Sequence, residues 1–243
     1  MATRLKIFMA TMAIMIIATL ICVGSIPLIA YAQSSTAAAE VAALAANPNP
    51  EVNQESGFRL PLLKREDIDD YGKKVYDQMF GPGGRLLAGI RGPSGIRLYS
   101  PKVAELEYSL SQYLRYQSGL SGPIRELAIL VTAREMDNQF EWTAHEPQGL
   151  KEGLPKATID IVKYRREVEG LPEMEAVVIQ LGRQIFGKKK VDSDIFARAL
   201  KIFGPRQLVE IVILMGHYSS TAALLTTFDM QLPPDQKPLL PLP

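Results

Sequence analysis

From residue 58 onward, apolar residues recur every three or four positions, the spacing that places them on one face of an α-helix. Alternation of the kind that builds a β-strand is scarce. Two segments begin with a serine closely followed by a proline, at Ser100-Pro101 and at Ser121 and Pro123. Serine suits a helix cap, and proline suits the first turn, where its missing N–H is not needed. The pattern therefore predicts an all-α fold, with one domain from residues 58 to 243.

The ends of the expected helices follow from their caps and from the apolar spacing. The helices should cover residues 100–119, 121–135, 140–151, 155–168, 172–186, 193–203 and 204–230. The last of these is apolar on several sides, which predicts a place in the core or in an oligomer interface. The proline-rich tail that follows should not be helical.

The segment between residues 79 and 101 contains six glycines and three prolines, too many for a continuous helix. It lacks the lysine and the Ser or Thr that end a phosphate-binding loop. A loop that covers a pocket is the natural interpretation.

Residues 1–32 have the pattern of an export signal. Arg4 and Lys6 precede an uncharged apolar run from 7 to 29, and Ala30-Tyr31-Ala32 provides the small residues of a cleavage site. We expect cleavage there and a periplasmic or secreted protein. The alternative is an uncleaved signal, which would be the protein's only membrane contact, because the apolar run is long enough to span a bilayer.

Residues 33–57 are rich in Ala, Ser, Asn and Pro and almost lack large apolar side chains, so we expect a flexible tether. The only cysteine, Cys22, lies in the signal, which excludes disulfides and thiol chemistry from the mature protein. The chain has 27 basic and 26 acidic residues, a balance that does not suggest a nucleic-acid partner. Only His145 and His217 remain as side chains that titrate near neutral pH.

Three stretches resemble the carboxymuconolactone decarboxylase family, which includes the AhpD-like alkylhydroperoxidases. They are "RELAILVTAREMDNQFEWTAHEPQGLKEGL" at 125–154, "RLPLLKREDIDDYGKKVYDQM" at 59–79 and "GHYSSTAALLTTFDMQLPP" at 216–234. The peroxidase branch of the family carries a Glu, two Cys and a His at fixed spacing. On this chain the Glu matches Glu126 and the His matches His145, whereas Asn138 and Glu141 occupy the two cysteine positions.

Because both thiols are missing, the resemblance does not carry thiol peroxidase activity to this chain. The decarboxylase branch, which also lacks the cysteine pair, is more similar. That resemblance implies an AhpD-like helical fold that assembles into trimers or hexamers, and a cofactor-free lyase or isomerase acting on a small lactone or oxo-acid.

Glu141 and His145 are one helical turn apart, so their side chains share a face and can exchange a proton. An alternative role for Glu141 is structural, because Asn138 and Glu141 have the spacing of a capping box. Glu126 could relay protons to His145, or simply stabilise the first turn of its helix through the helix dipole. We predict that His145, Glu141 and Glu126 are catalytic.

Arg134, Trp142 and His217 are the candidate substrate-binding residues, with a place in the core as the alternative for Trp142 and His217. Neither a His-x-x-x-His motif nor a triad of His and carboxylates is evident, so we expect no metal. The leading hypothesis is an exported acid–base enzyme of the decarboxylase type without a cofactor. The alternative is a non-catalytic helical oligomer of the cell envelope that binds a small molecule in the same pocket.

Overall fold

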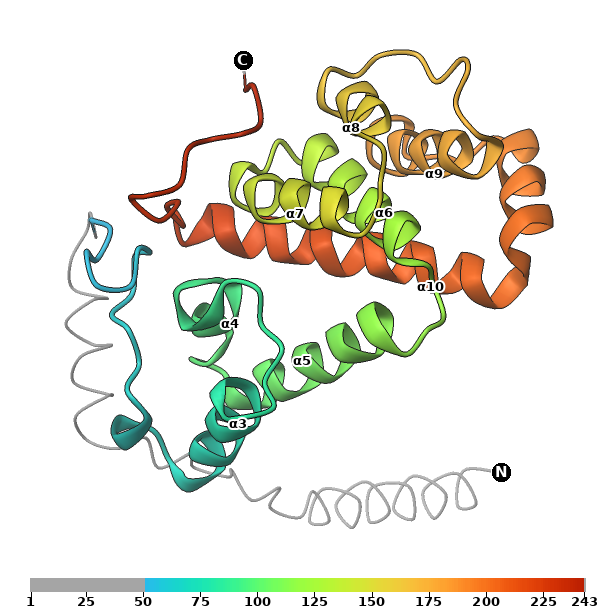
Figure 1. The fold of residues 1–243 in the computed structure, drawn as a ribbon. Coiled ribbons are helices and arrows are strands. Elements are labelled where there is room, and N and C mark those ends of the chain that lie inside the picture. The colour runs from blue at the N-terminus through green and yellow to red at the C-terminus, as the bar shows by residue number, and fades with distance from the viewer. Residues whose placement is uncertain (1–50, 243) are drawn as a thin grey trace, which may run out of the picture. The chain divides into compact units, whose positions relative to one another are not determined.

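The computed structural model describes residues 51–242 (Figure 1). Every regular element in this range is helical, which confirms the predicted all-α fold. The predicted signal and residues 33–50 of the predicted tether lie outside the described residues. The helices are α3 (Asp70–Phe80), α4 (Pro93–Arg97), α5 (Pro101–Tyr116), α6 (Gly122–Glu135), α7 (Gln139–Lys151), α8 (Lys156–Lys163), α9 (Glu173–Arg183) and α10 (Ser193–Thr227). Two 3-10 turns, Arg65–Asp67 and Gly89–Arg91, and a π turn, Gln184–Lys188, complete the set.

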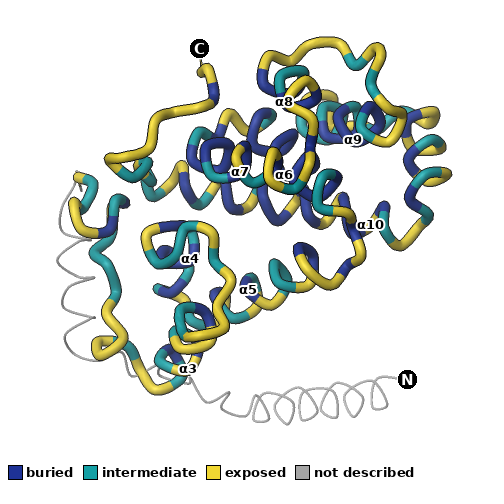
Figure 2. Tube along the Cα trace, viewed as in Figure 1, coloured by how far each residue is buried: buried dark blue, intermediate teal, exposed yellow. Residues whose placement is uncertain are grey.

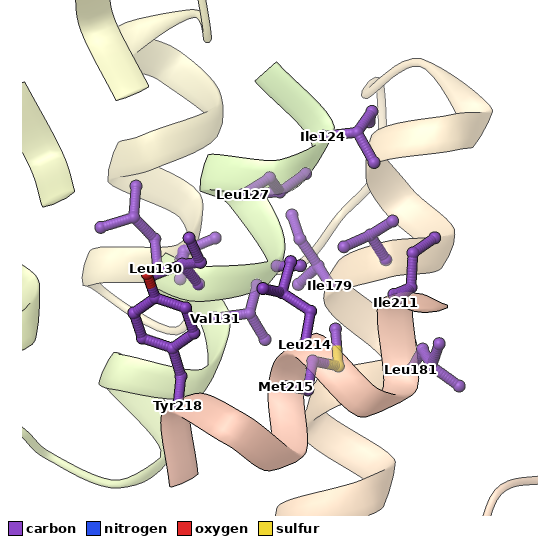
Figure 3. Close-up of a cluster of buried hydrophobic side chains, with 14 of the residues drawn as sticks. Ile124, Leu127, Leu130, Val131, Ile179, Leu181, Ile211, Leu214, Met215 and Tyr218 are labelled. Atoms are coloured by element: carbon purple, nitrogen blue, oxygen red, sulfur yellow. The ribbon is translucent and has the colours of Figure 1, made fainter. Parts of the chain in front are cut away.

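Helix α6 forms the centre of this domain. Its residues from Ile124 to Arg134 are all buried, and α7, α9 and α10 pack against it (Figures 1 and 2). Leu127, Leu130 and Val131 of α6 meet Met215 of α10 in the largest apolar cluster (Figure 3). Burial of such side chains stabilises a fold by about 1.5–3 kcal/mol each. The sequence of α6 fits this position, because it has hardly any polar residues in its middle.

Helix α10 contains a sharp bend. Gly204 has a positive φ of 67°, and Pro205 follows it, so the two predicted helices 193–203 and 204–230 meet there (Figure 1). The proline ring clashes with a continuous helix and removes one hydrogen bond. Among the described residues, α10 is also the one helix long and apolar enough to cross a membrane. However, 56% of its most apolar stretch is buried within the protein, as expected for a core helix.

The structure differs from the predicted helices in several ways, among them helix α3, which was not predicted, and the end of α10 at Thr227 rather than at residue 230. The glycine-rich segment is not a plain loop, because it contains the 3-10 turn and the short helix α4. Helix α8 ends at Lys163 rather than near 168, and Arg165 then takes a positive φ of 50°. Ser100 and Ser121 do precede their helices, but neither side chain makes a capping hydrogen bond.

The folded region begins earlier than residue 58. Ser56 is buried, and its hydroxyl donates a hydrogen bond to the carbonyl of Leu60. The backbone N–H of Gln231 donates to the carbonyl of Gly57 at 2.8 Å, which joins this segment to the tail. The last residues of the predicted tether are therefore part of the fold, held by hydrogen bonds that composition does not reveal.

Candidate functional site

A small cavity lies among α5, α7, α10 and the glycine-rich segment, with a volume of about 60 Å³. The segment supplies much of its wall, as the sequence predicted for a loop that covers a pocket. The polar side chains around it are Arg85, Ser94, Arg97, Ser111, Arg115, Glu141, His145, His217, Tyr218 and Thr221. Helices α4, α5, α7 and α10 thus bring together residues that are far apart in the sequence.

Glu126 and His145 form a buried pair across helices α6 and α7. Nδ1 of His145 lies 2.7 Å from Oε2 of Glu126. Burial alone would raise the pKa of Glu126, but the hydrogen bond with His145 and the charges of Arg115 and Arg125 lower it overall. An ionised carboxylate can only accept, so Nδ1 of His145 donates to Glu126, and Nε2 lies on the other side of the ring. Glu126 does not line the cavity, so it orients the imidazole of His145 from the side that faces away from the cavity.

Glu141 lies on the other side of the same imidazole. Its Oε2 is 3.5 Å from Nε2 of His145, and both residues line the cavity. Complete burial raises the pKa of Glu141, and the charges of His145 and Arg97 only partly oppose this effect. Two carboxylates with opposite pKa shifts thus flank one imidazole, and such a difference in environment separates an acid from a base.

The structure distinguishes the two proposed roles of Glu141. Oδ1 of Asn138 accepts a hydrogen bond from the backbone N–H of Glu141 at 2.9 Å, so Asn138 does cap α7. The reciprocal half of a capping box is absent, because the backbone N–H of Asn138 donates to the carbonyl of Ala133. The carboxylate of Glu141 is therefore directed to the site rather than to the cap.

Three arginines that the sequence did not indicate also line the cavity; Arg85 is exposed, whereas Arg97 and Arg115 are largely shielded from solvent. Arg115 is buried, with one Nη2 contact to Glu126 at 3.8 Å, and its Nε has no hydrogen-bond partner among the described residues. Arg97 donates to the hydroxyl of Thr221 and lies 3.6 Å from Glu107. The two shielded guanidinium groups at one small cavity favour an anionic group there. The place of Arg85 and Arg97 in the pocket-covering segment was the only signal in the sequence.

His217 reaches the same cavity from α10, as predicted for a pocket residue. Its Nδ1 lies 2.9 Å from Oε2 of Glu107, close enough for an ion pair, although the angle falls outside hydrogen-bond geometry. The contact with His217 lowers the pKa of Glu107 against the effect of partial burial. The ring of Tyr218 packs edge-on against both histidines, with centroids 5.1 Å from His145 and 5.4 Å from His217. Burial raises the pKa of Tyr218, so its hydroxyl stays protonated.

The structure places the other two candidates, Arg134 and Trp142, away from the cavity. Nη1 of Arg134 donates to the carbonyl of Pro241 at 2.9 Å, so this arginine fastens the tail. Trp142 is fully buried, and its indole N–H donates to Glu146, one turn further along α7. Because α6 is buried on all sides, its sequence does not show which side Arg134 faces. We do not include either residue in the site.

Within residues 51–242, no three His, Asp or Glu side chains are grouped as ligands for a metal ion. No family model matches the chain, and no curated protein matches its sequence. Its chemistry is therefore inferred from the arrangement of Glu126, His145, Glu141 and the two shielded arginines.

Proposed function

We propose that this protein is a cofactor-free lyase or isomerase that acts on a small lactone or oxo-acid by general acid–base catalysis. The observation that carries the proposal is the imidazole of His145 held between two carboxylates of opposite pKa shift, at a cavity with two shielded arginines. The sequence resemblance to the decarboxylase branch of the carboxymuconolactone decarboxylase family supports the same reaction class. It also supports an AhpD-like fold and, with the predicted signal, action outside the cytoplasm.

Each residue has one role in this proposal. Glu126 stays ionised and holds His145 in the tautomer whose Nε2 accepts a proton. Glu141, whose pKa is raised by burial, is the general acid. Arg97 and Arg115 bind the substrate's carboxylate or the oxyanion that develops from its carbonyl. His217 and Tyr218 complete the wall and donate or accept hydrogen bonds.

The reaction passes through an enolate. In an isomerisation, Nε2 of His145 removes a proton from the carbon next to the carbonyl, and the C–H electron pair moves onto the carbonyl oxygen. In a decarboxylation, the bond to the carboxylate breaks, carbon dioxide leaves, and the same electron pair forms the enolate. Glu141 then delivers a proton to carbon and regains one from solvent, and in the isomerisation His145 releases to solvent the proton that it removed. In both cases the arginines stabilise the negative charge at the moment when it forms.

Thiol peroxidase activity does not fit this chain. The single cysteine, Cys22, precedes the folded region. Of the two residues in the family's cysteine positions, Asn138 caps a helix and Glu141 contacts His145. Neither side chain can reduce a peroxide by forming a disulfide.

The proposal is tested by proton exchange, which does not require that the final product be known. Small lactones and 3-oxo-acids are incubated with the protein in D₂O, and ¹H NMR follows deuterium uptake next to the carbonyl. We expect exchange or turnover with at least one compound. His145→Ala and Glu141→Gln should slow it by about 10²–10⁴-fold, the usual contribution of a general acid or base.

Glu169→Gln is the matched control, because Glu169 is exposed and distant in sequence from the site. It should keep the wild-type rate. Binding of the same compounds without exchange or turnover would contradict the proposal and support the non-catalytic alternative. Full activity in both site variants would also contradict it.

A further inference from the structure

An open groove with a volume of about 640 Å³ adjoins the cavity. The two share four lining residues, Leu87, Ala88, Phe140 and Ala144, so the groove and the cavity lie on either side of the same side chains. Its other walls come from the 3-10 turn, from α7 and from the tail. The remaining lining residues are Arg91, Thr143, Pro147, Pro233, Gln236, Lys237 and Leu239.

The difference between the two volumes indicates that the cavity and the groove bind different parts of the substrate. A water molecule in a cavity takes up about 10–15 Å³ of its volume. The cavity of about 60 Å³ therefore holds only a few waters or a small functional group. Pockets that enclose a whole organic ligand typically measure about 300–1,000 Å³. The groove lies in that range, whereas the cavity does not. The inner site therefore admits the reacting group, and the rest of the substrate must lie in the groove.

The lining of the groove determines what it can bind. Leu87, Phe140, Pro147, Pro233 and Leu239 make its surface mainly apolar. The lining contains two cations, Arg91 and Lys237, and no acidic side chain. An apolar body suits such a surface, and a negatively charged molecule is attracted to it.

The tail is held in place as one wall of the groove. The backbone N–H of Leu239 donates to the hydroxyl of Thr143 at 3.3 Å, and Leu240 is buried next to it. Arg134 fixes the following turn through the carbonyl of Pro241. The side chain of Leu239 itself remains partly exposed toward the groove. The groove is thus formed by tethered segments and does not depend on a ligand for its shape.

We propose that the substrate is an amphipathic carboxylic acid, with its oxo or lactone headgroup in the cavity and an extended apolar body in the groove. The headgroup position rests on the proposed function, with Arg97 and Arg115 as its anionic partners. The position of the apolar body rests on the groove alone. Leu239 and Leu87 are exposed leucines of the lining that this apolar body would contact.

Calorimetric binding of a series of acids tests this proposal without catalysis. The probes are acetate, hexanoate and octanoate, with octan-1-ol as the neutral analogue of octanoate. Octanoate should bind at least about tenfold tighter than acetate, because each buried methylene strengthens binding. Octan-1-ol should bind more weakly than octanoate, because it lacks the charge that the arginines recognise.

Two substitutions in the tail form a matched pair. Leu239→Asp places a charge in the groove, and Leu242→Asp places one on an exposed leucine that does not line it. Leu239→Asp should remove most of the advantage of octanoate while leaving acetate binding unchanged, and the retained acetate binding shows that the fold is intact. Leu242→Asp should behave like the wild type.

The proposal is overturned if octanoate and acetate bind equally, if neither binds, or if the two aspartate variants have the same effect. The exchange assay on the wild type separates this proposal from the catalytic one. If affinity depends on the chain length of the acid but the wild type shows no proton exchange, the proposed binding in the groove is supported and the proposed enzyme function is contradicted. If exchange occurs without chain-length dependence, the opposite holds.

Discussion

At the scale of single residues, the site depends on the different environments of two carboxylates. Glu126 has cationic and hydrogen-bonding neighbours, and its pKa is lowered. Glu141 is completely buried, and its pKa is raised because the charges of His145 and Arg97 only partly oppose the effect of burial. His145 lies between them, 2.7 Å from the first and 3.5 Å from the second. The same environments that assign catalytic roles also determine how each carboxylate affects stability.

We predict opposite stability effects for Glu126→Gln and Glu141→Gln. At pH 7, Glu126→Gln should lower the free energy of unfolding by about 1–3 kcal/mol, because His145 and two arginines lose a charged partner. Glu141→Gln should raise it by about 1 kcal/mol, the usual scale of a single substitution, because a buried carboxyl group with a raised pKa destabilises the fold at pH 7. The ordinary pKa of both groups is 4.5.

The signs follow from proton binding. A carboxyl group with a lowered pKa stabilises the fold above 4.5, and this contribution disappears as pH falls toward its folded pKa. A carboxyl group with a raised pKa destabilises the fold progressively as pH rises from 4.5. Urea unfolding between pH 3 and 8 should therefore show both differences shrinking toward acid pH. Effects of equal sign, or differences independent of pH, would contradict the assigned environments.

The sequence predicted the site residues that lie close together along the chain, but not those that only the tertiary fold brings to the cavity. The pair Glu141 and His145 followed from helical spacing, and Glu126 followed from the family resemblance. Arg115 could not be found, because a charged residue near the end of an amphipathic helix is normally exposed. Only tertiary packing, which buries Arg115 against Glu126, identifies it.

At the scale of elements, prolines and glycines predicted helix ends better than serines did. Pro101 and Pro123 do lie in the first turns of α5 and α6, because the fixed ring allows few other conformations. The serine side chains before them do not cap. The residues after α8 could not be predicted, because Arg165 adopts a left-handed conformation that local propensity disfavours. Its side chain instead contacts Asp137 and the carbonyl of Arg134.

The bend in α10 leads to a prediction with two matched glycines. Gly204→Ala should lower the free energy of unfolding by about 1–2 kcal/mol, because Gly204 has a positive φ of 67°, a conformation that residues with a Cβ atom disfavour. Gly216→Ala, in the helical part of α10, should raise it by about 0.5–1 kcal/mol, because alanine favours a helix. An added Cβ meets no atom within 4 Å at either position. Thermal unfolding would measure both, and a loss at Gly216 or no loss at Gly204 would contradict this account.

At the scale of the whole molecule, a stripe of exposed apolar side chains remains on the described surface. Val209 is 61% exposed and Leu106 58% exposed, and Tyr113, Val212 and Ile213 on the same two helices are also exposed. Leu110, Leu114, Val209 and Ile213 line a shallow apolar hollow between α5 and α10. We name this stripe the α5–α10 face. Exposed apolar side chains on both sides of an apolar hollow are typical of an interaction surface.

We expect the α5–α10 face to form the interface of a homo-oligomer, the trimer or hexamer that the family resemblance implies. The double variant Val209→Glu, Ile213→Glu places two charges on the face and should yield monomers, because a buried, unpaired charge costs several kcal/mol. Met174→Glu is the control, since Met174 is exposed on α9, outside the face. Light scattering after size-exclusion chromatography measures the mass of each. A monomeric wild type would contradict the prediction, as would a double variant that keeps the wild-type mass. Because neither glutamate lies at the cavity, binding of octanoate should persist in the monomer, which would show that one chain contains the complete site.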